Sequence, residues 1–118
     1  MQRGYLTVTE KIKIQEVLVV EGKDDTANLR RFYDVDTYET RGSAINDDDL
    51  ERIEKLNDLR GVIVFTDPDY NGERIRKIIM NAIPNVKHAF LNVTTPENEI
   101  IMPSSTKRSA ISKEPENE

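Results

Sequence analysis

Two continuous apolar runs stand out in the chain, and each of them ends abruptly at acidic residues. Residues 62–65 read VIVF, and residues 12–20 alternate at first and then end in the run EVLVV. Unbroken runs of β-branched and aromatic residues are typical of strands buried on both faces of a parallel sheet. The pattern therefore predicts two central strands.

Three further segments have the apolar spacing of helices that pack one face against a sheet. We expect them over residues 26–32, over residues 50–59, and over residues 73–82, where Pro84 and Asn85 end the last one. The residues expected to face the sheet are Leu29 and Phe32 in the first helix, Leu50, Ile53, Leu56 and Leu59 in the second, and Ile75, Ile78, Ile79 and Ala82 in the third.

Weaker strand patterns at residues 36–40 and 86–91 complete an alternation of strand and helix. Short connections and right-handed crossovers make such a chain a three-layer α/β/α domain with a four-stranded parallel sheet. We expect this domain over residues 11–91, after an N-terminal extension of residues 1–10 and before a polar, mobile segment of residues 92–118. In the strand order 2-1-3-4, the chain reverses direction between strands one and three, which opens a crevice at their carboxyl ends.

Acidic residues follow both central strands at the point where that crevice would lie. Asp67 and Asp69 come shortly after residues 62–65, and Glu21 comes directly after residues 12–20. Carboxylates gathered in one crevice repel one another, which raises their pKa values unless a positive charge intervenes. Mg²⁺ prefers oxygen ligands and is commonly held by one or two carboxylates plus substrate phosphate. The pattern indicates metal-assisted phosphoryl transfer or phosphodiester hydrolysis.

Each of these acids also has an ordinary structural interpretation. Asp67, Pro68 and Asp69 form a normal turn sequence, and Glu21 alone would be a solvated loop acid. The coincidence of all three acids at matching strand ends favours a site. Residues 47–49 are three consecutive aspartates that resemble a metal cluster, but a helix cap with favourable charge at the positive end of the helix dipole explains them more simply.

Basic side chains near the predicted crevice suit a substrate that carries phosphate. Lys23 beside Glu21 can contact phosphate or pair with a neighbour, and Arg74 can hold phosphate near a helix N-terminus or lie on a solvated face. His88 is expected to be structural, and Ser43 lacks the partners of a nucleophilic serine. The basic residues that could line one edge are Arg30, Arg31, Arg41, Arg74, Arg76, Lys77 and Lys87.

The composition restricts the remaining options. The 118 residues carry a net charge of −5 and contain no cysteine. Disulfides, thiolate metal sites and thiol nucleophiles are therefore excluded, and a generally basic surface that coats nucleic acid is disfavoured. No apolar run reaches the ~18 residues of a membrane span, and residues 1–10 lack the apolar core of a signal peptide. We expect a cytoplasmic protein without a membrane segment.

Two segments together resemble the Toprim domain, the catalytic module shared by topoisomerases, primases and small nucleases. They are residues 19–25 (VVEGKDD) and residues 66–75 (TDPDYNGERI). Residues 42–46 (GSAIN) and 87–91 (KHAFL) are similar to that family's second loop and fourth strand, so the resemblance covers about residues 11–91. Within the superfamily, the chain most resembles the ribonuclease M5 family, endonucleases that mature precursor 5S ribosomal RNA in low-GC Gram-positive bacteria.

The resemblance implies a Toprim, Rossmann-like fold and assigns roles to the three acids. Glu21 would bind metal and assist proton transfer. Asp67 and Asp69 would be metal ligands, and Asp67 would touch both ions of a two-metal site. The implied metal is Mg²⁺, for which Mn²⁺ can substitute.

The same resemblance implies the substrate and its contacts. Gly22 and Gly72 would keep the backbone close to the site, beside the substrate-binding side chains of Lys23 and Arg74. The enzyme would cut double-stranded precursor 5S ribosomal RNA on both strands and leave 5′-phosphate and 3′-hydroxyl ends. The ribosomal protein that binds 5S RNA would help present this substrate to a monomeric enzyme.

The chain departs from the family pattern after residue 91. Family members continue into a Gly-Val-Glu-His-type motif and a C-terminal region that helps bind RNA, whereas residues 106–111 (TKRSAI) keep at most the basic approach to that motif. We interpret the chain as an excised catalytic domain or a truncated member. A non-catalytic Toprim module that binds RNA or assists ribosome assembly, and a DNA-acting Toprim nuclease or primase, stay open. A receiver-like or phosphatase-like domain ranks last, because Tyr70 and Asn71 follow Asp69.

Overall fold

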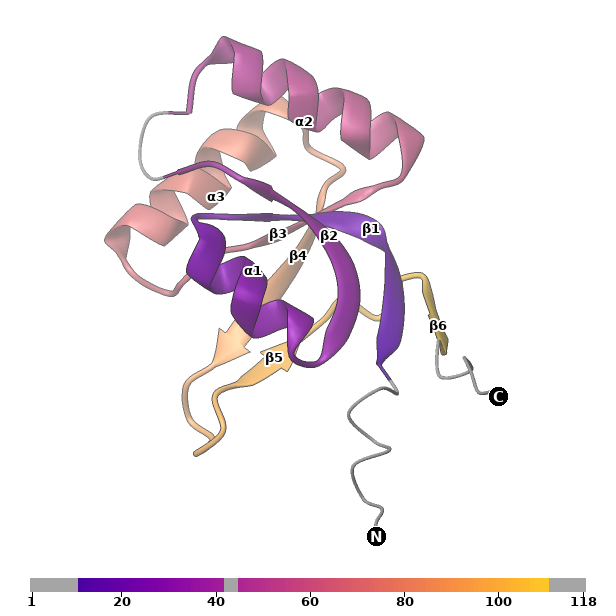
Figure 1. Cartoon of the computed structure of the whole chain (residues 1–118). Coiled ribbons are helices and arrows are strands. Elements are labelled where there is room, and N and C mark those ends of the chain that lie inside the picture. The colour runs from indigo at the N-terminus through magenta and orange to yellow at the C-terminus, as the bar shows by residue number, and fades with distance from the viewer. Residues whose placement is uncertain (1–10, 42–44, 111–118) are drawn as a thin grey trace, which may run out of the picture.

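The computed structural model of the protein describes residues 11–41 and 45–110 (Figure 1). The expected extension of residues 1–10, the loop residues 42–44 with Ser43, and residues 111–118 lie outside the described residues. Among the helices that are described, none is long and apolar enough to cross a membrane. The elements in chain order are β1 (Ile12–Val20), α1 (Lys23–Arg30), β2 (Tyr33–Glu39), α2 (Asp47–Leu59), β3 (Val62–Phe65), α3 (Tyr70–Ala82), β4 (Lys87–Asn92), β5 (Glu99–Ile101) and β6 (Arg108–Ala110).

Strand β1 lies in the middle of the sheet and organises it. The strand order is β2-β1-β3-β4-β5, and β6 pairs with β1 as a sixth strand. Because β1 pairs in parallel with β2 and β3, and β3 pairs in parallel with β4, the predicted order of the four parallel strands is confirmed. Residues 12–14 at the start of β1 pair antiparallel with β6, whereas residues 17–19 pair with β3.

Helices cover both faces of the sheet, and each face has its own apolar core (Figure 1). Helix α1 contributes Leu29 to the core on one face, where it joins Leu18 and Val20 of β1. Helices α2 and α3 cover the opposite face, where Ile53 and Ile79 join the second core. All four residues of β3 are buried, as the unbroken apolar run predicts. The three-layer α/β/α arrangement is therefore confirmed.

Apolar residues at the helix ends do not face the sheet as expected. Helix α1 ends at Arg30, and Phe32 lies in the following turn with 57% of its surface exposed. Leu59, the last residue of α2, is 80% exposed, and Ala82, the last residue of α3, is also exposed. These three expectations are wrong because the chain turns away from the sheet where each helix ends, although the apolar spacing continues.

The segment after residue 92 also differs from the expected mobile tail. Strand β5 runs antiparallel to β4 with Ile101 opposite Phe90, and β6 runs antiparallel to the start of β1. The sheet therefore has six strands rather than the four expected. Each added strand is only three residues long, too short for an alternating pattern to identify it from sequence.

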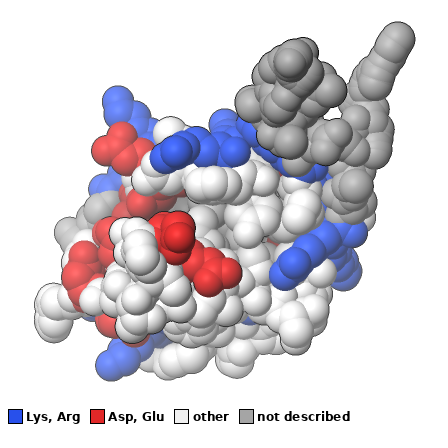
Figure 2. All heavy atoms as spheres, turned by 90° about the horizontal axis from the view of Figure 1, so that it is seen from below, with Lys and Arg blue, Asp and Glu red and all other residues white. Residues whose placement is uncertain are grey.

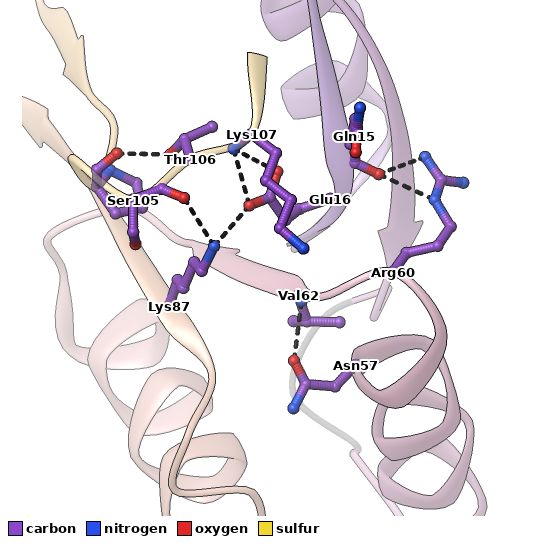
Figure 3. Close-up of polar contacts among 10 residues, drawn as sticks. Gln15, Glu16, Asn57, Arg60, Val62, Lys87, Ser105, Thr106 and Lys107 are labelled. Atoms are coloured by element: carbon purple, nitrogen blue, oxygen red, sulfur yellow. Dashed lines mark hydrogen bonds and ion pairs between the residues drawn. The ribbon is translucent and has the colours of Figure 1, made fainter.

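A buried glutamate fastens this segment to the sheet (Figure 3). Glu16, in the middle of β1, is fully buried, and its carboxylate accepts a hydrogen bond of 2.7 Å from Lys87 Nζ of β4. The backbone N–H of Lys107 donates to both carboxylate oxygens at 3.1 and 3.0 Å. Lys87 also donates to the carbonyl of Ser105 at 2.9 Å. One carboxylate thus connects β1, β4 and the residues that lead into β6.

The surroundings keep this glutamate charged. Burial alone raises the pKa of Glu16, but hydrogen bonds from Lys87 and from the Lys107 backbone outweigh it, so the pKa lies below its ordinary value. Gly61 leaves room for the side chain, because a Cβ there would lie 3.0 Å from Glu16 Cγ. Gly61 also has a φ of +90°, a backbone conformation that glycine adopts without steric cost.

Removing the cation from this buried pair should destabilise the protein. We expect Lys87→Met to lower the free energy of unfolding by roughly 3 kcal/mol, since it leaves a buried carboxylate without its partner. Lys13→Met is the matched control, because the Lys13–Asp34 pair has side chains 49% and 53% exposed, and exposed pairs contribute below about 1 kcal/mol. Urea unfolding measures both, and equal losses would contradict the structural role of Glu16.

The same pair should also give the stability an acid dependence. Because the pKa of Glu16 is lower in the folded protein, its contribution is complete above the unfolded-state pKa and is lost as pH falls through the folded-state pKa. We expect the stability difference between the wild type and Glu16→Gln to shrink as pH falls from about 5 to about 3, around the ordinary glutamate value. Urea titrations across this range measure it, and a constant difference would refute the linkage.

Candidate active site

The carboxyl ends of β1 and β3 bring two of the predicted acids into contact. Because Val19 of β1 lies opposite Val64 of β3 in the parallel register, the residues that follow the two strands emerge side by side. Glu21 Oε2 accepts a hydrogen bond from the backbone N–H of Asp67 at 3.3 Å. The crevice predicted between strands one and three therefore contains Glu21 and Asp67.

The first turn of α3 completes this edge. Asn71 Nδ2 donates to Glu21 Oε1 at 3.5 Å, and Arg74 Nη2 donates to Asn71 Oδ1 at 3.1 Å. Asp69 is the N-cap of α3, and its Oδ1 accepts the backbone N–H of Gly72 at 2.7 Å. The helix begins at Tyr70, earlier than the expected residue 73, because this cap satisfies one of its exposed N–H groups.

Negative charge accumulates at this edge of the molecule. Burial raises the pKa of Glu21, the backbone N–H of Asp67 opposes this, and the charges of Asp69, Asp67 and Asp25 raise it further. Partial desolvation raises the pKa of Asp67 as well, although this residue is exposed overall, and the charges of Asp25 and Asp69 add to the effect. In Figure 2, acidic side chains gather toward the left of the face, the side on which β1 and β3 end, with basic side chains around them. This edge would be stabilised by a bound cation.

The donor set suits a hard metal ion. Carboxylate oxygens are the ligands that Mg²⁺ takes, and the Glu21 carboxylate lies against the backbone of Asp67. Within residues 11–41 and 45–110, however, no three acidic or histidine side chains stand as a complete metal-binding group. Asp69 uses Oδ1 to cap α3, but a carboxylate has a second oxygen. The residues thus fit a metal in chemistry, and the three-ligand site stays a prediction.

The other predicted site residues differ in how closely the fold constrains them. Lys23 is exposed at the first position of α1, next to its N-cap Gly22. A Cβ at Gly22 would meet nothing within 4 Å, so no steric reason for glycine exists there. A Cβ at Gly72 would lie 2.1 Å from the carbonyl oxygen of Asp67 and 3.0 Å from Glu21 Oε2. Gly72 therefore allows α3 to approach the two acids.

Two residues of the site were missed in the sequence. Asp25 contributes charge to both Glu21 and Asp67 while its Oδ2 accepts the Gly22 N–H at 3.0 Å. Asn71 contacts Glu21 directly. A sequence signal for Asp25 was present, because it lies in the same VVEGKDD segment as Glu21, but an acid beside a helix start can equally serve as a cap.

Several other candidates have structural roles away from this edge. Asp49 of the triple aspartate forms a capping box with Asn46 at the start of α2 and accepts a hydrogen bond from the Tyr38 hydroxyl at 2.7 Å. Arg76 is buried and donates to His88 Nδ1 at 2.9 Å. Since arginine can only donate, this His88 nitrogen must be an acceptor. His88 is thus structural as expected, whereas Arg76 and Lys87 do not line a free basic edge.

A family model described as the Toprim domain matches residues 16–94, which include Glu21, Asp67 and Asp69. The chain belongs to the Toprim family. This match extends over most of β1 and through β4, the part of the fold that carries the acidic edge.

Relatives of this Toprim chain agree with that membership. It is 69% identical over 85 residues to a ribonuclease M5 of Lactococcus lactis, a match that covers 72% of this chain and 41% of the relative. It is 62% identical over 97 residues to a ribonuclease M5 of Streptococcus pneumoniae, covering 82% of this chain and 50% of the relative. The chain thus spans half or less of the length of these curated relatives.

A solved structure supports the Toprim fold independently. The small Toprim domain protein from Bacillus stearothermophilus aligns with a TM-score of 0.60 at 23% identity, over 80% of this chain and 75% of that chain. At this level of identity the similarity concerns the fold alone. The Toprim architecture inferred from the sequence motifs is therefore confirmed.

The two glycines of the Toprim site offer a sharp steric test. We expect Gly72→Ala to lower the free energy of unfolding by about 1–3 kcal/mol, as overpacking does, because the added Cβ collides with the Asp67 carbonyl. Gly22→Ala should cost less than about 1 kcal/mol, the loss for a poorer N-cap. Chemical denaturation compares the two variants, and a larger loss in Gly22→Ala would show that this site geometry is wrong.

Proposed function

We propose that the chain is the catalytic part of a metal-dependent endoribonuclease that cleaves precursor 5S ribosomal RNA during its maturation. The observation that carries this proposal is the hydrogen bond from the backbone N–H of Asp67 to the Glu21 carboxylate, which places these two acidic residues side by side at the ends of neighbouring parallel strands. The ribonuclease M5 relatives in L. lactis and S. pneumoniae support the choice of substrate.

Glu21, Asp67 and Asp69 would hold the metal, with Mg²⁺ as the ion, two ions per site, and Mn²⁺ as a substitute. When bound, the metal stabilises charge on the phosphate and activates water. Glu21 would also assist proton transfer through its carboxylate, as the family resemblance implies. This arrangement explains why the acids crowd together at one sheet edge despite their mutual repulsion.

Basic residues at the same edge would bind the RNA backbone. Arg74 is anchored by Asn71, which itself contacts Glu21, so its guanidinium is held beside the acids at the first turn of α3. Lys23 is exposed at the start of α1, two residues after Glu21 in the sequence. Each can pair with a phosphate next to the one that is cleaved.

The partners and compartment follow from this substrate. The ribosomal protein that binds 5S RNA would present the precursor, and the chain would act as a monomer in the cytoplasm, where ribosomal RNA is processed. The ribonuclease M5 relatives are about twice as long as the aligned segment. We therefore assign only the cleavage chemistry to this chain, and further RNA contacts to a region like the remainder of those relatives.

A second candidate function is a Toprim module that binds RNA without cutting it. It is favoured by the side-chain arrangement, in which Asp69 caps α3 and no three acids of the described residues form a complete metal group. The two candidates differ in one measurable outcome, which is the release of cleaved RNA in Mg²⁺.

Cleavage of precursor 5S ribosomal RNA tests the proposal directly. The chain is incubated with Mg²⁺, the precursor and the ribosomal protein that binds 5S RNA. We expect Asp67→Asn and Asp69→Asn each to reduce cleavage at least about 10²-fold, comparable to losing one charge-stabilising group from an active site. Asparagine removes the negative charge but keeps the shape of the aspartate side chain. At position 69 it is also as good an N-cap as aspartate.

The matched control is Asp58→Asn, which changes an exposed acid of α2 and should leave cleavage unchanged. Thermal unfolding separates loss of function from loss of fold. Because the pKa of Asp67 is raised by burial and by neighbouring acids, Asp67→Asn should be at least as stable as the wild type at neutral pH. Undiminished cleavage by both site variants would refute the nuclease, and binding without cleavage by the wild type would favour the second candidate.

A further inference from the structure

A groove leaves the acidic edge on the α1 side of the sheet. It is a cavity of about 520 Å³ between α1 and the β4–β5 hairpin, with Asp25 and Asp67 at one end and Phe32 among its other lining residues. A second hollow of about 450 Å³ shares Phe32, Glu97, Asn98 and Ile100 with it, so the two adjoin. We call these two adjoining hollows together the α1 groove. Its size is typical of pockets that bind small molecules.

The α1 groove begins at the predicted catalytic acid and ends at an exposed aromatic ring. Phe65, Leu91 and Ile100 provide apolar surface between the two ends. Phe32 is 57% exposed, and the guanidinium of Arg31 lies over its ring, with Arg31 Cζ 5.4 Å from the ring centroid. A cation held on an aromatic face is a common partner for nucleic acid, since the ring stacks on a base and the cation attracts phosphate.

The polar lining selects which part of a nucleotide can enter. The polar lining residues are three acids, two amides and one arginine, namely Asp25, Asp67, Glu97, Asn28, Asn98 and Arg31. The carboxylates of Asp25 and Glu97, which are not among the proposed metal ligands, repel phosphate from the groove, and Arg31 attracts it only beside Phe32. A neutral base meets no such repulsion, and its exocyclic amino group can donate to a carboxylate. The α1 groove therefore suits a nucleobase rather than a phosphate.

We infer that the α1 groove holds one nucleobase of the RNA substrate that has left its base pair or lies in a bulge of the duplex, stacked on Phe32 with Arg31 beside its phosphate. This inference rests on the proposed function, because it extends the same site by one nucleotide beyond Asp67. Unpaired bases are the usual target of base-specific RNA recognition, since their edges are accessible. The acidic lining gives a preference as well, because adenine, cytosine and guanine carry an amino group and uracil does not.

The test measures binding without cleavage. The probe is an RNA hairpin with a single 2-aminopurine in a bulge, and the comparison hairpin has the same base paired in the stem. Ca²⁺ replaces Mg²⁺ so that the RNA is not cut. The full 118-residue chain is titrated into each probe while fluorescence is recorded, because stacking quenches 2-aminopurine. Wild-type protein should quench the bulged probe more strongly than the paired one.

Aromatic variants on the two faces of the sheet form the matched set. Phe32→Ala should raise the Kd for the bulged probe about 5- to 150-fold and abolish the quench, as expected for loss of one base–aromatic stack. Phe32→Trp should keep the wild-type Kd and the fluorescence quench. Phe90→Ala is the control, because Phe90 is 48% exposed and packs under Arg76 of α3 on the opposite face. Phe90→Ala should quench the fluorescence of the bulged probe as strongly as the wild type does. Circular dichroism checks that every variant is folded.

The outcomes of this experiment test base binding in the α1 groove separately from RNA cleavage. Wild-type affinity and quench in Phe32→Ala, or an equal loss in Phe90→Ala, would overturn the base site. Binding of both probes with no quench would also overturn it and would leave the α1 groove to an apolar protein segment. Competition by hairpins with uracil in the bulge should be weaker than with adenine or cytosine. A chain that quenches the probe but never cuts RNA would refute only the nuclease.

Discussion

The parallel pairing of β1 with β3 is the interaction on which both the fold and the candidate site depend. Residues 17–19 lie opposite residues 62–64, and all of them are buried between helices on the two faces. A slip of one residue would exchange the face of every side chain and disrupt both cores at once. Packing therefore fixes the register, and the same register places Glu21 against Asp67.

Two glutamates on or just after β1, Glu16 and Glu21, have opposite electrostatic surroundings. The carboxylate of Glu16 is buried but receives Lys87 and a backbone N–H, so its pKa is lowered and the charge belongs to the core. The pKa of Glu21 is raised by burial and by neighbouring acids. The acid in the middle of the strand thus has its counter-charge within the described residues, while the carboxyl end of the strand concentrates negative charge that a cation from solution would neutralise.

The sequence predicted the parts of the fold that depend on local patterns. The buried runs identified β1 and β3, and the spacing of Leu50, Ile53 and Leu56 identified α2. Strands β5 and β6 could not be predicted, because three-residue strands are defined by distant partners rather than by their own pattern. The candidate site was predicted from acids that follow the ends of strands. The sequence does not show how α1 is placed, which determines the effect of Asp25 on Asp67, or where α1 ends, which determines the exposure of Phe32.

The positions of the charges also suggest how a protein of net charge −5 can bind a polyanion. Asp25 lies close enough to the acidic edge to raise the pKa of Asp67 and also lines the α1 groove, as Glu97 does. These two acids would repel the backbone of a bound RNA from the space in front of Phe32. In the proposed function, favourable places for phosphate would be Arg31 at one end of the groove and the acidic edge with its bound metal at the other, where Arg74 also lies. A strand that satisfies both would have to turn its neutral base into the groove. Repulsion, as much as attraction, would then determine which phosphodiester bond reaches Glu21 and Asp67.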